Sequence, residues 1–176
     1  MIDKYKYSDK EMDEIIKSMV ILWDSREQKN NHILDVFEKN NIAYQKKALE
    51  RCDYSFYIPA NNSLNIPRAL FFDKEIAIER KASLDELANN WTKERDRFEK
   101  EMCLAPKTKI LLIENSNYED IVNGNYRSQY NKKAFLASLH TFWFRYNMPV
   151  FFMPNKNTSA LFIKKYFEYY LKEFLR

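Results

Sequence analysis

Glycine is almost absent from this chain. Gly124 is the only glycine among 176 residues. Loops that wrap the phosphates of a nucleotide need several glycines, because their backbone N–H groups must approach the ligand closely. The scarcity of glycine therefore argues against an enzyme that cradles a nucleotide in such a loop.

Cysteines and long apolar runs are scarce as well. Cys52 and Cys103 are the only cysteines, and no Cys-x-x-Cys pair occurs, so the sequence predicts neither a zinc site nor a disulfide framework. No apolar run approaches the roughly 18 residues that cross a bilayer. The first residues are polar and tyrosine-rich, unlike a signal peptide. We expect an intracellular protein without a membrane anchor, in the cytoplasm or, in a eukaryote, the nucleus.

Apolar and basic residues are plentiful. Hydrophobic residues make up 45% of the chain and aromatic residues 16%, which is enough for one sizeable core and one main domain. Lysine and arginine total 29 against 25 acidic residues, and the net charge is +4. This balance suits a nucleic-acid partner, although charge alone does not establish one.

Residues 76–85 carry the most informative pattern. The run Ile-Ala-Ile at 76–78 predicts a buried strand. Ser83 and Glu86, three positions apart, form a capping-box pattern that opens a helix. The charged residues between these two signals therefore lie where a strand ends.

Strand geometry divides these charges between two faces. Successive side chains alternate, so Glu79 and Lys81 point one way and Arg80 points the other. A carboxylate binds a hard divalent cation through oxygen, and a neighbouring lysine orients or activates a water or offsets developing charge. Phosphodiester hydrolysis needs this minimum set, but a strand end with solvated charges has the same pattern.

Two upstream stretches add carboxylates at strand ends. The apolar run at 20–23 ends in Asp24, and Asp53 stands at the head of an aromatic, strand-prone run. A divalent cation needs several oxygen ligands from different elements. If the three strands are neighbours, they supply what a metal site requires.

These motifs occur in the order of a known family. The sequence resembles the nuclease domain of the XPF and MUS family of structure-specific endonucleases, within the restriction-endonuclease-like group. The resemblance rests on Asp24-Ser-Arg-Glu27, then Asp53, then Glu79-Arg80-Lys81-x-x-x-Asp85. Cys52 stands where the family has glycine before the second motif, which bears on how closely a metal or phosphate approaches Asp53. Many family members append a helix-hairpin-helix domain, and we expect none here.

The resemblance implies a Mg²⁺-dependent DNA endonuclease in which Mn²⁺ substitutes for Mg²⁺. Asp53 and Glu79 would be metal ligands, and Asp24 a further ligand, directly or through water. Lys81 would position or activate the attacking water. Asp85 would support the carboxylate cluster from the start of the next helix.

Further basic and aromatic residues are candidate DNA contacts. Arg26 and Arg80 would contact phosphates or hold the carboxylates. Relatives in the restriction-endonuclease-like group often place an Arg, Gln or Glu of the helix after residue 83 beside the metal site, and Arg95 is the candidate for contacting the scissile phosphate. In the segment 116–130, Tyr126 and Arg127 suit stacking on bases or gripping phosphates, although loop solubility explains them nearly as well. The charges around Arg95 also fit a solvated helix face.

The chain reads as alternating helices and strands, which predicts a three-layer α/β/α restriction-endonuclease-like fold with a mixed central sheet. Residues 1–19 are interpreted as an N-terminal helical extension and residues 20–176 as the XPF-like nuclease domain. A polar loop is expected at 116–130, and Glu114 is expected near the metal-bearing edge. The expected helices are 9–18, 29–39, 83–104, 132–146 and one from about 157, and the expected strands are 20–23, 42–49, the run after Asp53, a hairpin of 69–72 with 75–79, 108–113 and 150–152.

The functional hypothesis is cleavage of branched or flapped DNA. A surplus of aromatic residues on the last helix predicts a homodimer. Two alternatives stay open: a catalytically inactive DNA-binding or scaffold subunit of a nuclease heterodimer, and a restriction-type or Holliday-junction nuclease that shares only the Asp…Glu-x-Lys core.

Overall fold

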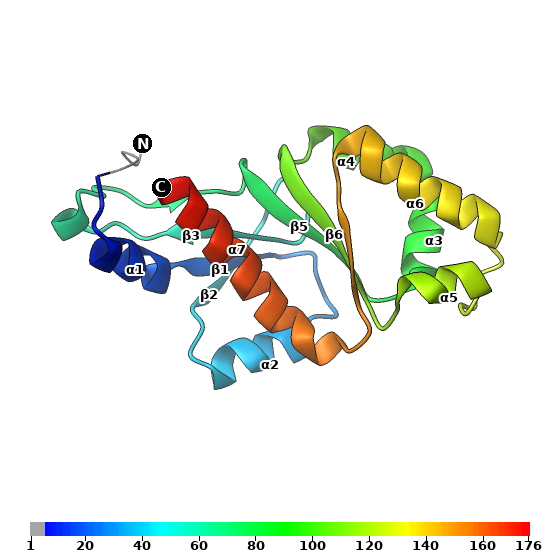
Figure 1. Ribbon diagram of the computed structural model, residues 1–176, viewed down its shortest axis with the longest axis horizontal. Coiled ribbons are helices and arrows are strands. Elements are labelled where there is room, and N and C mark those ends of the chain that lie inside the picture. The colour runs from blue at the N-terminus through cyan, green and yellow to red at the C-terminus, as the bar shows by residue number, and fades with distance from the viewer. Residues whose placement is uncertain (1–5) are drawn as a thin grey trace.

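A seven-stranded mixed sheet forms the centre of the computed structural model, which describes residues 6–176 (Figure 1). Residues 1–5 of the predicted extension lie outside this range. The strand order is β2-β1-β3-β5-β6-β7, and β4 pairs with β3. The strands are β1 (Val20–Asp24), β2 (Tyr44–Lys47), β3 (Tyr54–Ile58), β4 (Leu70–Phe71), β5 (Ile76–Lys81), β6 (Thr108–Glu114) and β7 (Val150–Met153).

Helices cover both faces of this sheet and complete three layers (Figure 1). One buried apolar cluster joins one face to α1, α2 and α7, and a second joins the other face to α3, α4, α5 and α6. The predicted three-layer α/β fold with a mixed sheet is confirmed. The helices are α1 (Asp9–Ser18), α2 (Asn31–Lys39), α3 (Leu84–Thr92), α4 (Arg95–Leu104), α5 (Tyr118–Asn123), α6 (Lys132–Tyr146) and α7 (Ser159–Leu175), with short 3-10 turns at Asn62–Leu64 and Lys156–Thr158.

Strand β5 lies inside the sheet, between β3 and β6, and all its residues are buried. Burial on both faces explains why its first half reads as a continuous apolar run. Ile78 joins the cluster under α1, α2 and α7, and Ala77 joins the opposite cluster. Continued alternation sends Arg80 toward the first face and the pair Glu79 and Lys81 toward the second, as the sequence predicts.

The predicted single helix over 83–104 is wrong, because the chain breaks at Lys93 and Glu94 into α3 and α4. The hydroxyl of Thr92 donates to the carbonyl of Ala88 at 2.7 Å, and the side-chain amide of Asn90 donates to Glu94 at 3.1 Å. Asparagine and threonine are weak helix formers that compete for backbone and side-chain partners in this way. The break changes which side chains of α4 face the sheet edge.

Two further expectations need correction. Strands β4 and β5 do not form a hairpin, because both run antiparallel to β3 and follow each other along it, separated by a turn after Phe72. The segment 116–130 is not all loop, since it contains α5. Asn117 and Asp120 form the capping box that starts this helix, and Gly124, at φ 78°, ends it in the left-handed conformation.

The N-terminal helix belongs to the packed body of the protein. A capping box formed by Ser8 and Glu11 starts it. Ile15 and Met19 are buried in the same cluster as Phe167 and Leu171 of α7. Within residues 6–176, no helix is both long and apolar enough to cross a membrane.

Candidate active site

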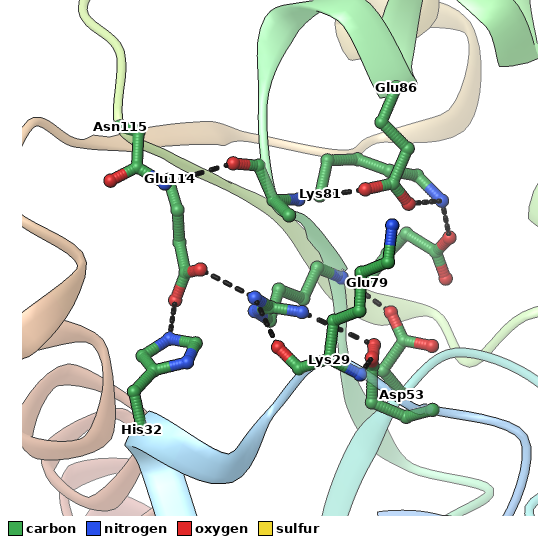
Figure 2. Close-up of polar contacts among 11 residues, drawn as sticks. Lys29, His32, Asp53, Glu79, Lys81, Glu86, Glu114 and Asn115 are labelled. Atoms are coloured by element: carbon green, nitrogen blue, oxygen red, sulfur yellow. Dashed lines mark hydrogen bonds and ion pairs between the residues drawn. The ribbon is translucent and has the colours of Figure 1, made fainter.

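A polar pocket of about 430 Å³ opens where the charged end of β5 meets the loop before β3, the loop after β1 and helices α3 and α4. Asp53, Glu79 and Lys81 line it together. Figure 2 shows Asp53, Glu79 and Lys81 close together beside the end of the sheet. The three residues of the Asp…Glu-x-Lys core, 28 positions apart in the chain at their extremes, are therefore brought to one place.

Asp53 is fixed by its backbone and by its side chain. Its N–H donates to the carbonyl of Ile78 at 2.9 Å, and its own carbonyl accepts the N–H of Asp24 at 2.8 Å. One carboxylate oxygen accepts the N–H of Arg80 at 2.7 Å. Desolvation, followed by the negative charge of Glu79, raises the pKa of Asp53 well above its ordinary value. A cation at this position would relieve that repulsion.

Lys81 forms the positive side of the pocket. Its Nζ lies 2.7 Å from Glu79 Oε1 and 3.8 Å from Glu86 Oε1, and it lies 5.5 Å from the centre of the Phe98 ring. Desolvation opposes the charged form, but the charges of Glu79 and Asp53 outweigh it and raise the pKa of Lys81 above its ordinary value. The ammonium therefore stays protonated at neutral pH, which suits orienting a water or phosphate oxygen better than accepting a proton.

Arg80 points to the other side of the sheet, where it holds a buried network. Its guanidinium lies 2.6 Å from Glu114 Oε2 and 3.4 Å from Glu27 Oε2, and it donates to the carbonyl of Lys29 at 3.1 Å. The other oxygen of Glu114 lies 2.9 Å from His32 Nε2, as Figure 2 shows. Arg80 borders the pocket as well, but only 3% of its side chain is exposed and its guanidinium is engaged in these ion pairs.

Asp24 is not brought into this pocket. Its carboxylate accepts the N–H of Arg26 at 2.7 Å, the Nε of Arg26 at 2.9 Å, its second guanidinium nitrogen at 2.7 Å and the N–H of Leu49 at 3.2 Å. Desolvation raises the pKa of Asp24, but the hydrogen bonds and charge of Arg26 outweigh it and hold that pKa below its ordinary value. Asp24 shapes the loop after β1 and positions Arg26, which lines the pocket.

Asp85 also lies outside the pocket, on the other side of α3. One of its oxygens accepts the backbone N–H groups of Arg127 and Ser128 at 2.8 and 2.7 Å. The other accepts Nε of Arg127 at 3.2 Å. These bonds outweigh the effect of desolvation and lower the pKa of Asp85. The residue anchors the segment after α5 rather than joining the carboxylates of the pocket.

Two other predicted DNA contacts are engaged elsewhere. Arg95 pairs with Glu99 at 2.9 Å and lies over the ring of Phe142. Tyr126 donates its hydroxyl to the carbonyl of Tyr130 at 2.8 Å and packs its ring against the second apolar cluster. Neither side chain lines the pocket.

Arg97 lines the pocket instead of Arg95, with 70% of its side chain exposed. A continuous helix from Ser83 would have placed Arg95 and Arg97 differently. Because the helix breaks at Lys93, the helical period alone could not show that Arg97 lines the pocket. Glu86 is a second residue that sequence reasoning missed. The capping-box pattern was the signal that could have found it, because the glutamate of such a pattern folds back toward the start of its helix, here next to the end of β5. In the structure Glu86 accepts the N–H of Ala82 at 3.0 Å.

Two of the three predicted metal ligands, Asp53 and Glu79, line the pocket with their carboxylates. Within residues 6–176, no group of three or more histidine, cysteine, aspartate or glutamate side chains is placed to hold a metal ion. Mg²⁺ keeps several waters and binds through one or two carboxylates together with substrate phosphates. The pair therefore fits Mg²⁺ better than a metal such as zinc, which needs three or four protein ligands.

Comparisons with known proteins agree with this geometry. The family model described as "ERCC4 domain" matches residues 23–166. XPF from Aeropyrum pernix superimposes with a TM-score of 0.60 and 15% identity over 86% of this chain, and the same protein in complex with DNA gives 0.62 and 16% over 88%. This chain spans 61% and 66% of those two chains, and no curated protein matches it significantly. The predicted XPF-type fold is confirmed, and because the family model covers most of the chain, the chain belongs to the ERCC4 domain family.

Proposed function

We propose that this protein is a Mg²⁺-dependent DNA endonuclease that acts preferentially on branched or flapped DNA. The observation that carries the proposal is the meeting of Asp53, Glu79 and Lys81 in one solvent-accessible pocket. A fold shared with XPF, which has been solved in complex with DNA, supports DNA as the substrate class.

Asp53 and Glu79 would hold the cation, with water and a phosphate oxygen completing its coordination. When bound, Mg²⁺ polarises the phosphoryl oxygen and lowers the pKa of a bound water. We expect Mn²⁺ to substitute, since it accepts the same oxygen ligands. Asp24 has no part in this set, because Arg26 and Leu49 occupy its oxygens.

The cations of the pocket have separate roles. Lys81 is held in place by Glu79 and donates toward the attacking water or the charged phosphate. Arg97 and Arg26 line the same pocket with 70% and 60% of their side chains exposed. Exposed guanidinium groups contact phosphates and fix the position of the strand without reading its sequence.

Preference for a branch follows from this kind of contact. Phosphate contacts carry no sequence information, so selectivity must come from the shape and deformability of the DNA. A junction offers bendable, partly unstacked strands that a matched duplex lacks. We therefore expect branched DNA to be cut well above linear duplex, with little dependence on base sequence and a steep loss of binding as salt rises.

Cys52 bears on the rival hypothesis of an inactive subunit. Its backbone has φ 60°, the left-handed conformation that favours glycine. The backbone before Asp53 therefore follows a glycine-like path although the residue is cysteine, and the side chain is buried in the second apolar cluster. This arrangement leaves Asp53 placed for metal binding and favours the active enzyme.

We also propose a homodimer formed through α7. Its inner face is buried, while Leu161 and Tyr169 keep exposed fractions of 55% and 62%, and Phe151 on the edge strand β7 keeps 39%. An apolar surface of this kind on a helix and an edge strand suits a second copy of the chain. Light scattering at micromolar concentration tests it: Tyr169→Glu should give monomer, and a monomeric wild type would contradict the proposal.

The decisive test is a cleavage assay on labelled flap, fork, four-way and linear DNA with and without Mg²⁺. Asp53→Asn and Glu79→Gln should abolish cleavage and keep the fold, measured by circular dichroism, because they remove metal ligands. Glu50→Gln is the matched control, since it removes an exposed carboxylate that lines the same pocket.

Three results would change the assignment. Near wild-type cleavage by either metal-ligand variant would disprove the metal site. Cutting of linear duplex at one fixed sequence would favour the restriction-type alternative. Binding of branched DNA without cleavage in Mg²⁺ or Mn²⁺ would favour the inactive-subunit alternative.

A further inference from the structure

A second groove lies on the other side of helix α3 from the pocket. It has a volume of about 790 Å³ and is bounded by Asn89, Thr92 and Lys93 on one side and by residues 127–130 on the other. We call it the α3 groove. Glu86 and Asn90 of the same helix line the pocket, so α3 forms the wall between the two depressions.

Asp85 holds the two sides of the α3 groove together. It binds the backbone N–H groups of Arg127 and Ser128 and the Nε of Arg127, which fixes residues 127–130 beside the helix. These three donors also offset the negative charge of its carboxylate. The charged groups of the lining are therefore Lys93 and the ion pair of Asp85 with Arg127, which leaves a net positive charge.

The exposed lining is suited to an anionic polymer with hydrogen-bonding bases. The Arg127 side chain is 92% exposed, and Lys93 is exposed without an ion pair among residues 6–176. Asn89, Thr92 and Gln129 add neutral donors and acceptors. Tyr130 also borders the groove, but its ring packs on Phe135 and its hydroxyl bonds to Ser138. Positive charge together with amide groups suits single-stranded nucleic acid, whose phosphates and unpaired base edges are both accessible.

We propose that the α3 groove binds a single-stranded segment of nucleic acid, namely the unpaired branch of a substrate whose junction occupies the pocket. The identity of that strand as a branch rests on the proposed function, whereas binding of a single strand does not. The eight steps of helix rise from Asp85 to the C-cap Lys93 extend about 12 Å at about 1.5 Å per residue. At a rise of about 3.4 Å per nucleotide this length accommodates about three nucleotides.

A single strand fits this groove better than a duplex does. Base edges of a duplex are accessible only inside its own grooves, which an element must enter from outside. The α3 groove is concave, so its amides reach bases only when these are unstacked and unpaired.

Binding without metal tests the proposal separately from cleavage. The variant Lys93→Ala/Arg127→Gln leaves the backbone bonds of Asp85 intact. Its matched control is Lys39→Ala/Arg68→Gln, which removes the same two charges from exposed sites outside both depressions. Fluorescence anisotropy with labelled oligothymidylate and with a matched duplex, over a series of salt concentrations, measures the affinity of each protein.

The groove variant should bind the single strand about tenfold more weakly, and its slope of log affinity against log salt should fall by about 1.4, at about 0.7 for each lost phosphate contact. Duplex affinity should change less than about twofold, as should both affinities of the control variant. Equal losses on single strand and duplex, or no loss on either, would overturn the proposal.

The same experiment separates this proposal from the proposed function. A selective loss of single-strand binding, in a protein that cuts no DNA with Mg²⁺, would retain the groove and reject the endonuclease. Unchanged single-strand binding, in a protein that cuts flaps with Mg²⁺, would reject the groove and retain the endonuclease. Crosslinking of an oligonucleotide carrying 5-iododeoxyuridine, mapped by mass spectrometry, should label residues 127–130, and labelling confined to other segments would contradict the assignment.

Discussion

Replacing Arg80 by methionine should destabilise the protein strongly. Arg80 and Glu114 lie 2.6 Å apart with exposed fractions of 3% and 0%. The change Arg80→Met leaves the Glu114 carboxylate buried with the His32 ring as a hydrogen-bond partner at 2.9 Å. Breaking a buried ion pair by removing one member costs about 3–5 kcal/mol, because the other charge stays desolvated and unpaired.

Glu114→Gln should cost less than Arg80→Met. Glutamine keeps an oxygen that accepts a hydrogen bond, and Arg80 retains Glu27 at 3.4 Å, so the expected loss is about 1–3 kcal/mol. The double variant removes both charges, and its loss should be smaller than the sum of the single losses by about 0.5–3 kcal/mol. For a domain of this size each kcal/mol lowers the melting temperature by about 2–4 °C.

Urea and thermal unfolding followed by circular dichroism measure these effects. Arg97→Met is the matched control, because its ion pair with Glu101 is exposed and should contribute less than about 1 kcal/mol. An Arg80→Met protein no less stable than the control, or strictly additive losses in the double variant, would refute the reasoning. If stability is unchanged and DNA affinity falls, Arg80 is a phosphate contact, which is one of the two roles that the sequence left open.

Other residues give sharper tests of single assignments. Arg97→Ala should lower cleavage of flap DNA about tenfold or more, by removing about 1.5–3 kcal/mol of charged hydrogen bonding, while Arg95→Ala should change it less than about twofold. Cys52→Gly should change the free energy of unfolding by less than about 1 kcal/mol, measured in urea, because relief of left-handed strain offsets lost side-chain burial. The pKa of Asp24 lies below 3.8 in the folded state, so its stabilisation is present above about pH 4 and is lost as pH falls through the lower value. Urea midpoints measured between neutral and acidic pH should therefore fall less steeply for Asp24→Asn than for wild type.

Local periodicity explains what the sequence predicted well. Alternation along a strand is fixed by backbone geometry, so the separation of Arg80 from Glu79 and Lys81 followed from the residues alone. The start of α3 was predicted from local sequence as well, because Ser83 is its N-cap and accepts the N–H of Glu86. These features need no knowledge of distant contacts.

The other placements depend on interactions that sequence spacing does not encode. Asp24 stands at a strand end as a metal ligand would, but in the structure its oxygens accept hydrogen bonds from Arg26, an arrangement that the fold of the loop makes. Arg97 rather than Arg95 lines the pocket because the helix breaks at Lys93. Each of these placements concerns the direction of a side chain after a loop or a break, where no regular period applies.

The Glu-Arg-Lys motif joins the chemistry of the site to its scaffold. Glu79 and Lys81 face the pocket, while Arg80, between them, is held on the opposite side by Glu27 and Glu114. A shift of β5 by one residue would separate Arg80 from Glu27 and Glu114 and would place Glu79 on the face that holds those two carboxylates. The buried Arg80 network therefore favours the observed register of β5, and through it the position of Glu79, the carboxylate that we propose as a metal ligand. Loss of activity in an Arg80 variant is informative only when its stability has been measured as well.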